Sequence, residues 1–180
     1  WPGLLIPTEL GGSDGSLLDI ILLIEEMGRA CFPSPYIQSA VVATSLLLTA
    51  GSRTQQERFL PAMACGERIG TLALTEESAD FAPAAMAMRG DVGGRLNGSK
   101  LFVKDAHVAD HLLVVVHGNG GLNLVLVERD QPGVTLLPLE VMSGEKLFEV
   151  VLHDVPVRED MLLGPAGKGW EYLAPVLQYG

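Results

Sequence analysis

The stretch Ile69–Glu76 (IGTLALTE) marks the point at which the hydrophobic pattern of this chain changes. Before it, apolar residues recur at helical spacing in segments that Gly, Ser and Pro separate. After it, short runs rich in Val, Leu and Thr alternate with turn signals such as Asn97-Gly98 and Pro132-Gly133. The sequence therefore predicts helices upstream of this stretch and an all-β unit downstream of it.

Three helices are expected upstream. The first covers Leu17–Met27, is apolar on nearly every face and is expected to be buried on most of them, with Gly28 as its stop. The second covers Ser39–Ala50. Thr54-Gln55-Gln56-Glu57 matches a capping box, which predicts a third helix that Pro61 kinks or shortens.

The β unit is expected to be a small sandwich or barrel, because seven short strands follow at regular spacing. A helical pattern resumes at Trp170–Leu177. The fold class is thus α+β and multidomain, with a helical domain over 1–68, a β domain over 69–166 and the start of a second helical domain over 167–180. The predicted strands are Ile69–Thr75, Ala85–Gly90, Leu101–Lys104, Leu112–His117, Leu122–Val127, Val134–Leu137 and Leu147–Leu152.

Composition narrows the class of protein. The 180 residues are 48% hydrophobic and 19% charged, which excludes a disordered chain. The low charged fraction suggests apolar surface meant for neighbours, and the abrupt ends suggest a fragment. A net charge of −10 argues against nucleic acid as a partner. No apolar run reaches the length of about 20 residues that a membrane span needs.

The two cysteines, Cys31 and Cys65, provide neither a disulfide framework nor metal-ligand spacing. We expect buried thiols in a reducing cytosol, and therefore a cytoplasmic protein. His107 and His111 stand four residues apart, but their flanks resemble a turn and a strand, so we expect loop histidines rather than a metal pair. No metal site is predicted.

Two further motifs favour structural roles. Gly11–Gly15 matches the nucleophile-elbow pattern G-x-S-x-G around Ser13, but no strand is expected before it, so an N-capping turn is favoured over a serine hydrolase. Gly164–Gly169 lacks the spacing of a phosphate-binding loop and is expected to be a connector. The adjacent carboxylates Glu76 and Glu77 would point to opposite faces of a strand end, unlike a glycosidase pair.

The order of several longer segments resembles the acyl-CoA dehydrogenase family. Gln56–Glu67 (QERFLPAMACGE) followed by Ile69–Glu76 carries the resemblance, together with Trp1–Gly12 upstream. Leu96–Val103 (LNGSKLFV) looks like the family's "NG-x-K" hairpin. The resemblance covers essentially the whole chain.

The resemblance implies a helical N-terminal domain, a middle β domain and a C-terminal helical domain that is almost entirely missing here. It further implies that FAD takes a hydride from Cβ of an acyl-CoA thioester while a glutamate of the C-terminal domain removes the Cα proton. No catalytic residue is therefore assigned in this chain, and the 180 residues alone are expected to be inactive. Implied partners are an electron-transfer flavoprotein or similar acceptor and further subunits of a homo- or hetero-oligomer, in fatty acid or sterol side-chain degradation.

Site residues are carried over from the resemblance position by position. A strand ending near Thr75 would offer backbone amides and a hydroxyl to the polar edge of the flavin. The implied FAD-binding residues are Leu72, Leu74, Thr75, Phe102, Val103 and Lys104, and the implied substrate-binding residues are Ser78 and Asp80.

Two positions depart from the family pattern. The family commonly has Trp followed two residues later by Thr or Ser, whereas this chain has Phe102 and Lys104. The segment Glu77–Phe81 replaces the family's usual P-x-A-G-S-D. These departures support an alternative: a non-catalytic partner subunit of a heteromeric acyl-CoA dehydrogenase that has lost part of its flavin site.

Overall fold

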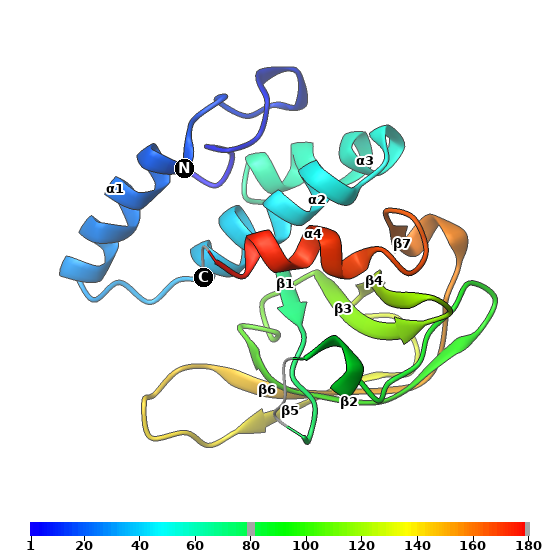
Figure 1. Ribbon diagram of the computed structural model, residues 1–180. Coiled ribbons are helices and arrows are strands. Elements are labelled where there is room, and N and C mark those ends of the chain that lie inside the picture. Colours follow the sequence, from blue (N-terminus) through cyan, green and yellow to red (C-terminus); the bar gives the residue numbers. More distant parts are fainter. Residues whose placement is uncertain (79–81, 179–180) are drawn as a thin grey trace.

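A computed structural model describes residues 1–78 and 82–178. Helices form one layer, a four-stranded sheet the second and a three-stranded sheet the third (Figure 1). This arrangement confirms the prediction of a helical region followed by a β sandwich and a short helix near the end.

The helical layer contains one π-helical segment and four α-helices. In Figure 1, α1 extends to one side while α2, α3 and α4 lie over the first sheet. The bounds are α1 Leu17–Arg29, the π-helical η2 Ile37–Ala43, α2 Thr44–Ala50, α3 Arg53–Ala64 and α4 Gly169–Val176, with 3₁₀ turns η1 Thr8–Leu10, η3 Pro83–Ala85 and η4 Glu159–Met161.

The strands divide into two sheets. The first has the order β1-β3-β4-β7, with β1 parallel to β3 and the other pairs antiparallel. The second has the order β2-β6-β5 and is antiparallel throughout. The bounds are β1 Gly70–Ala73, β2 Arg95–Lys104, β3 His111–Gly118, β4 Gly121–Glu128, β5 Val134–Leu139, β6 Leu147–Pro156 and β7 Leu162–Leu163.

Strand β3 lies at the centre of the molecule. Leu112 and Val114 belong to the core between the two sheets, whereas Leu113 and Val115 belong to the core between the first sheet and the helices. Because both faces of the strand are covered, its sequence is a continuous apolar run rather than an alternating pattern. This double burial fixes the order of the three layers.

The expected burial of the first helix is wrong. Within α1 only Ile20 is buried, and Leu18 and Ile21 are 64% and 52% exposed. The helix packs on a small hydrophobic cluster that includes Tyr36, Ala40 and Val41. Gly28 lies inside α1 rather than beyond its end.

The cap of α3 also differs from the prediction. Ser52, not Thr54, is the N-cap, and its reciprocal partner is Gln55. Glu57 instead pairs with Arg53 at 2.7 Å. Serine is at least as good a cap as threonine, and the helix begins two residues earlier than predicted. The helix continues past Pro61 to Ala64.

The predicted strand Ala85–Gly90 is not formed. This segment holds the turn η3 and a single bridge between Arg89 and His117. The N–H groups of Ala87 and Met88 donate to the carboxylate of Glu76, so they are unavailable for a strand ladder. The prediction of buried thiols is wrong as well, because Cys31 and Cys65 are both exposed.

Candidate functional site

The residues carried over for the flavin meet where the end of β1 lies beside the end of β2. The N–H of Leu101 donates to the carbonyl oxygen of Thr75 at 2.8 Å. The hydroxyl of Thr71 donates to the carbonyl oxygen of Lys104 at 2.7 Å. These two bonds join strands of different sheets, and we call this region the β1–β2 edge, made of Thr71–Glu76 and Lys100–Lys104.

A β-bulge in β2 shapes the β1–β2 edge. Lys100 pairs with Val150 and Val103 pairs with Phe148, so Leu101 and Phe102 together oppose one residue, Glu149. The bulge frees the N–H of Leu101 to reach Thr75. Phe102 adopts a left-handed conformation with φ of +55° and leaves its side chain 51% exposed. Such a conformation costs about 1–3 kcal/mol for a non-glycine residue and is typical of functional positions.

The six side chains have different surroundings. Leu74 is buried in the helix-side core and Leu72 packs against it, while Val103 is buried between the sheets. Leu74 and Val103 can therefore face a ligand only through their backbone, whereas Leu72 is only partly buried. Thr75 is half-buried, and its hydroxyl makes no hydrogen bond within residues 1–78 and 82–178.

Lys104 is exposed at the end of the edge. Its ammonium pairs with the carboxylate of Glu145 at 2.9 Å, and Glu145 also accepts from the Ser143 hydroxyl. The Lys104 ammonium and Ser143 hydroxyl lower the pKa of Glu145. Thr75, Phe102 and Lys104 thus supply the accessible side chains: a hydroxyl, an aromatic ring and a cation already paired.

A buried ion pair underlies the edge and was not predicted from the sequence. The Lys100 ammonium lies 2.6 Å from a Glu76 carboxylate oxygen, with the Lys100 side chain fully buried. Burial lowers the pKa of Lys100, against the opposing effect of Glu76. For Glu76, burial acts to raise the pKa, but Lys100 and the N–H groups of Ala87 and Met88 outweigh it, so that the pKa is lowered and the carboxylate stays charged.

The two residues implied for substrate binding are only partly placed. Ser78 is exposed in the turn after Glu76, on the chain next to the β1–β2 edge. Asp80 lies outside the described residues.

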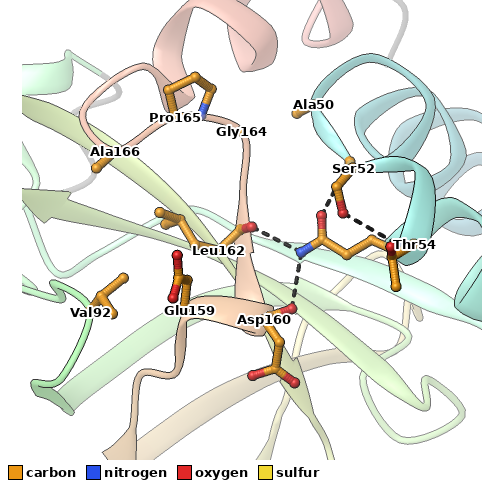
Figure 2. Close-up of a pocket in the computed structure, with 12 residues that line it drawn as sticks. Ala50, Ser52, Thr54, Val92, Glu159, Asp160, Leu162, Gly164, Pro165 and Ala166 are labelled. Carbon is orange, nitrogen blue, oxygen red and sulfur yellow. Dashed lines mark hydrogen bonds between the residues drawn. The ribbon is translucent and has the colours of Figure 1, made fainter.

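A pocket of about 1110 Å³ opens elsewhere, between the α2–α3 junction and the segment around β7 (Figure 2). The Gln55 amide bridges it by donating to the carbonyl oxygens of Asp160 and Leu162 at 3.0 and 2.9 Å. None of the residues carried over for the flavin lines it, and the charged side chains at its wall, Glu159 and Asp160, are both acidic. Negative walls disfavour a phosphate-bearing ligand. Both amide protons of Gln55 are already used in the two hydrogen bonds that join α3 to the segment around β7.

The remaining motifs have structural roles. Ser13 follows the turn η1 rather than a strand and precedes α1, whose cap is Ser16, which removes the geometry of a nucleophile elbow. His107 stacks on Phe148, whereas His111 is buried at the start of β3 with its Nδ1 unpaired. Hence the expectation of loop histidines fails for His111, because Phe59 and the first sheet cover it.

In the described part of the chain, no three His, Cys, Asp or Glu side chains are grouped so that they could hold a metal ion. Among residues 1–78 and 82–178, no helix has the length and apolar character needed to cross a membrane.

Comparison with known proteins identifies the two regions of the fold. Residues 1–67 match the family model described as acyl-CoA dehydrogenase, N-terminal domain, and residues 71–155 match acyl-CoA dehydrogenase, middle domain. Acryloyl-CoA reductase (NADH) of Anaerotignum propionicum is 29% identical over 183 residues, covering 94% of this chain and 46% of the relative. The chain spans about half the length of the curated relatives it matches.

Solved structures agree with this assignment. Butyryl-CoA dehydrogenase from Megasphaera elsdenii is 26% identical with a TM-score of 0.88, over 99% of this chain and 51% of the other. An acyl-CoA dehydrogenase complexed with FAD from Bacillus anthracis is 26% identical with a TM-score of 0.86, over 99% of this chain and 33% of the other.

Proposed function

The chain belongs to the acyl-CoA dehydrogenase family, and on that premise we propose that it is part of an FAD-dependent enzyme that removes hydrogen from Cα and Cβ of an acyl-CoA thioester. The observation that carries the proposal is the β1–β2 edge, where the half-exposed ring of Phe102 lies close to the Thr75 hydroxyl, which has no hydrogen-bond partner among the described residues. We further propose domain boundaries at 68/69 and 166/167.

The residues at the edge fit a flavin. The Phe102 ring is a planar, half-exposed surface on which an aromatic ring system can stack. The Thr75 hydroxyl is free to donate to a polar ring edge, and Leu72, Leu74 and Val103 fix the backbone around it. When bound, FAD supplies hydride acceptance, while the protein supplies orientation and hydrogen bonds.

The division of labour follows from the same premise. We assign Ser78 and Asp80 to acyl-CoA binding, and Lys104 to the flavin side of the edge. The base that removes the Cα proton is assigned outside these 180 residues, so they are expected to be inactive on their own. An electron-transfer flavoprotein or similar acceptor, assembly into oligomers and a cytoplasmic location complete the proposal.

The visible spectrum of the purified protein tests the proposal. The full-length protein is expected to carry bound flavin that bleaches when acyl-CoA esters of different chain length or ring structure are added without oxygen. Absence of a flavin chromophore, or a chromophore that no acyl-CoA bleaches, would overturn the enzyme proposal.

A second candidate is a non-catalytic partner subunit. The Lys104–Glu145 ion pair favours it, because a cation held at this position replaces the hydroxyl expected from the family pattern. For such a subunit, the protein purified alone would lack flavin and would gain acyl-CoA dehydrogenase activity only with a second, flavin-bearing chain.

A further inference from the structure

We propose that the buried Lys100–Glu76 ion pair is the positioning element of the β1–β2 edge, holding Thr75 and Phe102 in the geometry that receives the flavin. This inference rests on the proposed function. Neither residue is exposed enough to touch a ligand: the Lys100 side chain is fully buried and the Glu76 side chain is 8% exposed. Both therefore act through their neighbours.

The contacts of Lys100 join the two strands. Its ammonium donates to Glu76 at 2.6 Å and to the carbonyl oxygen of Leu74 at 3.2 Å. Leu74 and Glu76 flank Thr75, so the Lys100 ammonium of β2 is hydrogen-bonded to the residues on both sides of Thr75. Leu101, directly after Lys100, makes the third bond, from its N–H to the Thr75 carbonyl.

The contacts of Glu76 hold a segment without a strand ladder of its own. The carboxylate accepts from the N–H of Ala87 at 2.6 Å and from the N–H of Met88 at 3.2 and 3.3 Å. Three separate stretches of chain thus converge on one pair: the end of β1, the bulge of β2 and the segment before Arg89.

The physical cost of the pair supports a positioning role over a purely stabilising one. Removing two charges from water carries a large penalty, so a buried ion pair adds little net stability relative to an uncharged pair of similar shape. The ion pair instead fixes the local geometry of the chain, because the ammonium and the carboxylate each need several correctly placed hydrogen-bond partners. The bulge and the left-handed Phe102 lie one and two residues from Lys100, where the irregular backbone has to be held in one geometry.

The test uses a neutral pair of similar shape, Lys100→Met with Glu76→Gln. Glutamine keeps an oxygen that can accept from Ala87 and Met88, and methionine fills the volume of the lysine stem. The matched control is Arg95→Gln with Asp154→Asn, which removes an exposed ion pair that also starts from β2 but ends on β6, remote from the bulge. Each purified protein is titrated with FAD, melted, and measured for hydrogen exchange at the Leu101 amide.

If the ion pair has a positioning role, the neutral double variant should unfold cooperatively near the wild-type temperature. Its Kd for FAD should rise about tenfold or more, because small displacements of a binding group are enough to weaken binding. The Leu101 amide should also exchange faster than in the wild type. The control pair should bind as the wild type does. Wild-type Kd and wild-type Leu101 exchange in the folded neutral pair would overturn the inference.

Two outcomes separate this inference from the proposed function. If the wild type itself binds no FAD, the cofactor proposal is wrong, and the inference is judged on Leu101 exchange alone: unchanged exchange overturns it. If the double variant does not fold, Glu76→Asp is measured instead, since it keeps the negative charge beside Lys100 but shortens the reach of the carboxylate, and unchanged Kd and exchange in that variant again overturn the inference.

Discussion

Strand β3 is buried on both faces, whereas the β1–β2 edge combines buried and exposed residues, and the two are built on opposite principles. In β3, Leu112–Val116 are fully buried, regularly paired and entirely apolar. At the β1–β2 edge, the chain contains a bulge, a left-handed Phe102 and a buried ion pair. The regular strand binds the layers together, whereas the irregular edge contains the accessible groups, which is the usual division between stability and function.

The largest effect is expected from breaking the ion pair on one side. Lys100→Met leaves the Glu76 carboxylate buried without its cation, which should lower the free energy of unfolding by about 3–5 kcal/mol. Urea denaturation measures the loss. A loss smaller than that of the neutral double variant would show that the charge of Glu76 is not compensated by Lys100.

Truncation in the regular strand should come next. Leu113→Ala removes a fully buried side chain between β3 and the helices, and a cost of about 2–5 kcal/mol is expected because a cavity remains. FAD affinity measured on the folded fraction should be unchanged. Leu137→Ala, at a position 45% exposed, is the matched control and should change stability by no more than about 0.5 kcal/mol.

A glycine at the bulge should separate stability from binding. Phe102→Gly relieves the left-handed strain and should raise the free energy of unfolding by about 1 kcal/mol. The same change removes the stacking ring, so FAD titration should show weaker binding. Lower stability together with unchanged FAD affinity would assign Phe102 to packing alone.

The smallest effect should be a pH dependence from β3. Burial lowers the pKa of His111, against Asp110 and Glu128, which raise it, while Arg68 and Arg58 lower it further. The unfolded chain then binds a proton more readily than the folded one, so stability is complete above about pH 6.5 and declines as the pH falls below it.

Thermal unfolding between pH 5 and 8 measures this contribution of His111 to the pH dependence of stability. The matched variant His111→Gln carries no titrating ring and should lose the part of the decline that lies below pH 6.5. A decline of equal size in the variant would assign the pH dependence to other groups.

Much of the fold could be predicted from local pattern. The apolar run Leu112–His117 predicts β3 to within a residue at either end, because burial on both faces is visible in composition. The strand expected over Ala85–Gly90 failed because Glu76 captures two of its N–H groups, a competition that no local pattern reveals. The expected burial of the first helix failed for a similar reason, because an apolar helix face does not show which segment, if any, packs against it.

The candidate site was predictable in part. The family resemblance pointed to Thr75 and Phe102, and the structure brings both to one edge. The ion pair beneath was missed because Glu76 and Lys100 are 24 residues apart, and a charged residue within a strand is ordinarily exposed. A usable signal was the strand period, which places Lys100 on the same face as the buried Leu96.

The most direct test of the account is FAD titration of the purified protein beside two glycine variants, Phe102→Gly and Phe32→Gly. Phe32 is also an exposed phenylalanine, at 62%, but lies after α1 and away from the edge. We predict that the wild type and Phe32→Gly bind FAD alike and that Phe102→Gly binds it at least about fivefold more weakly, because the lost ring would contribute about 1 kcal/mol or more. Equal affinity of all three proteins for FAD would contradict the placement of the flavin at the β1–β2 edge.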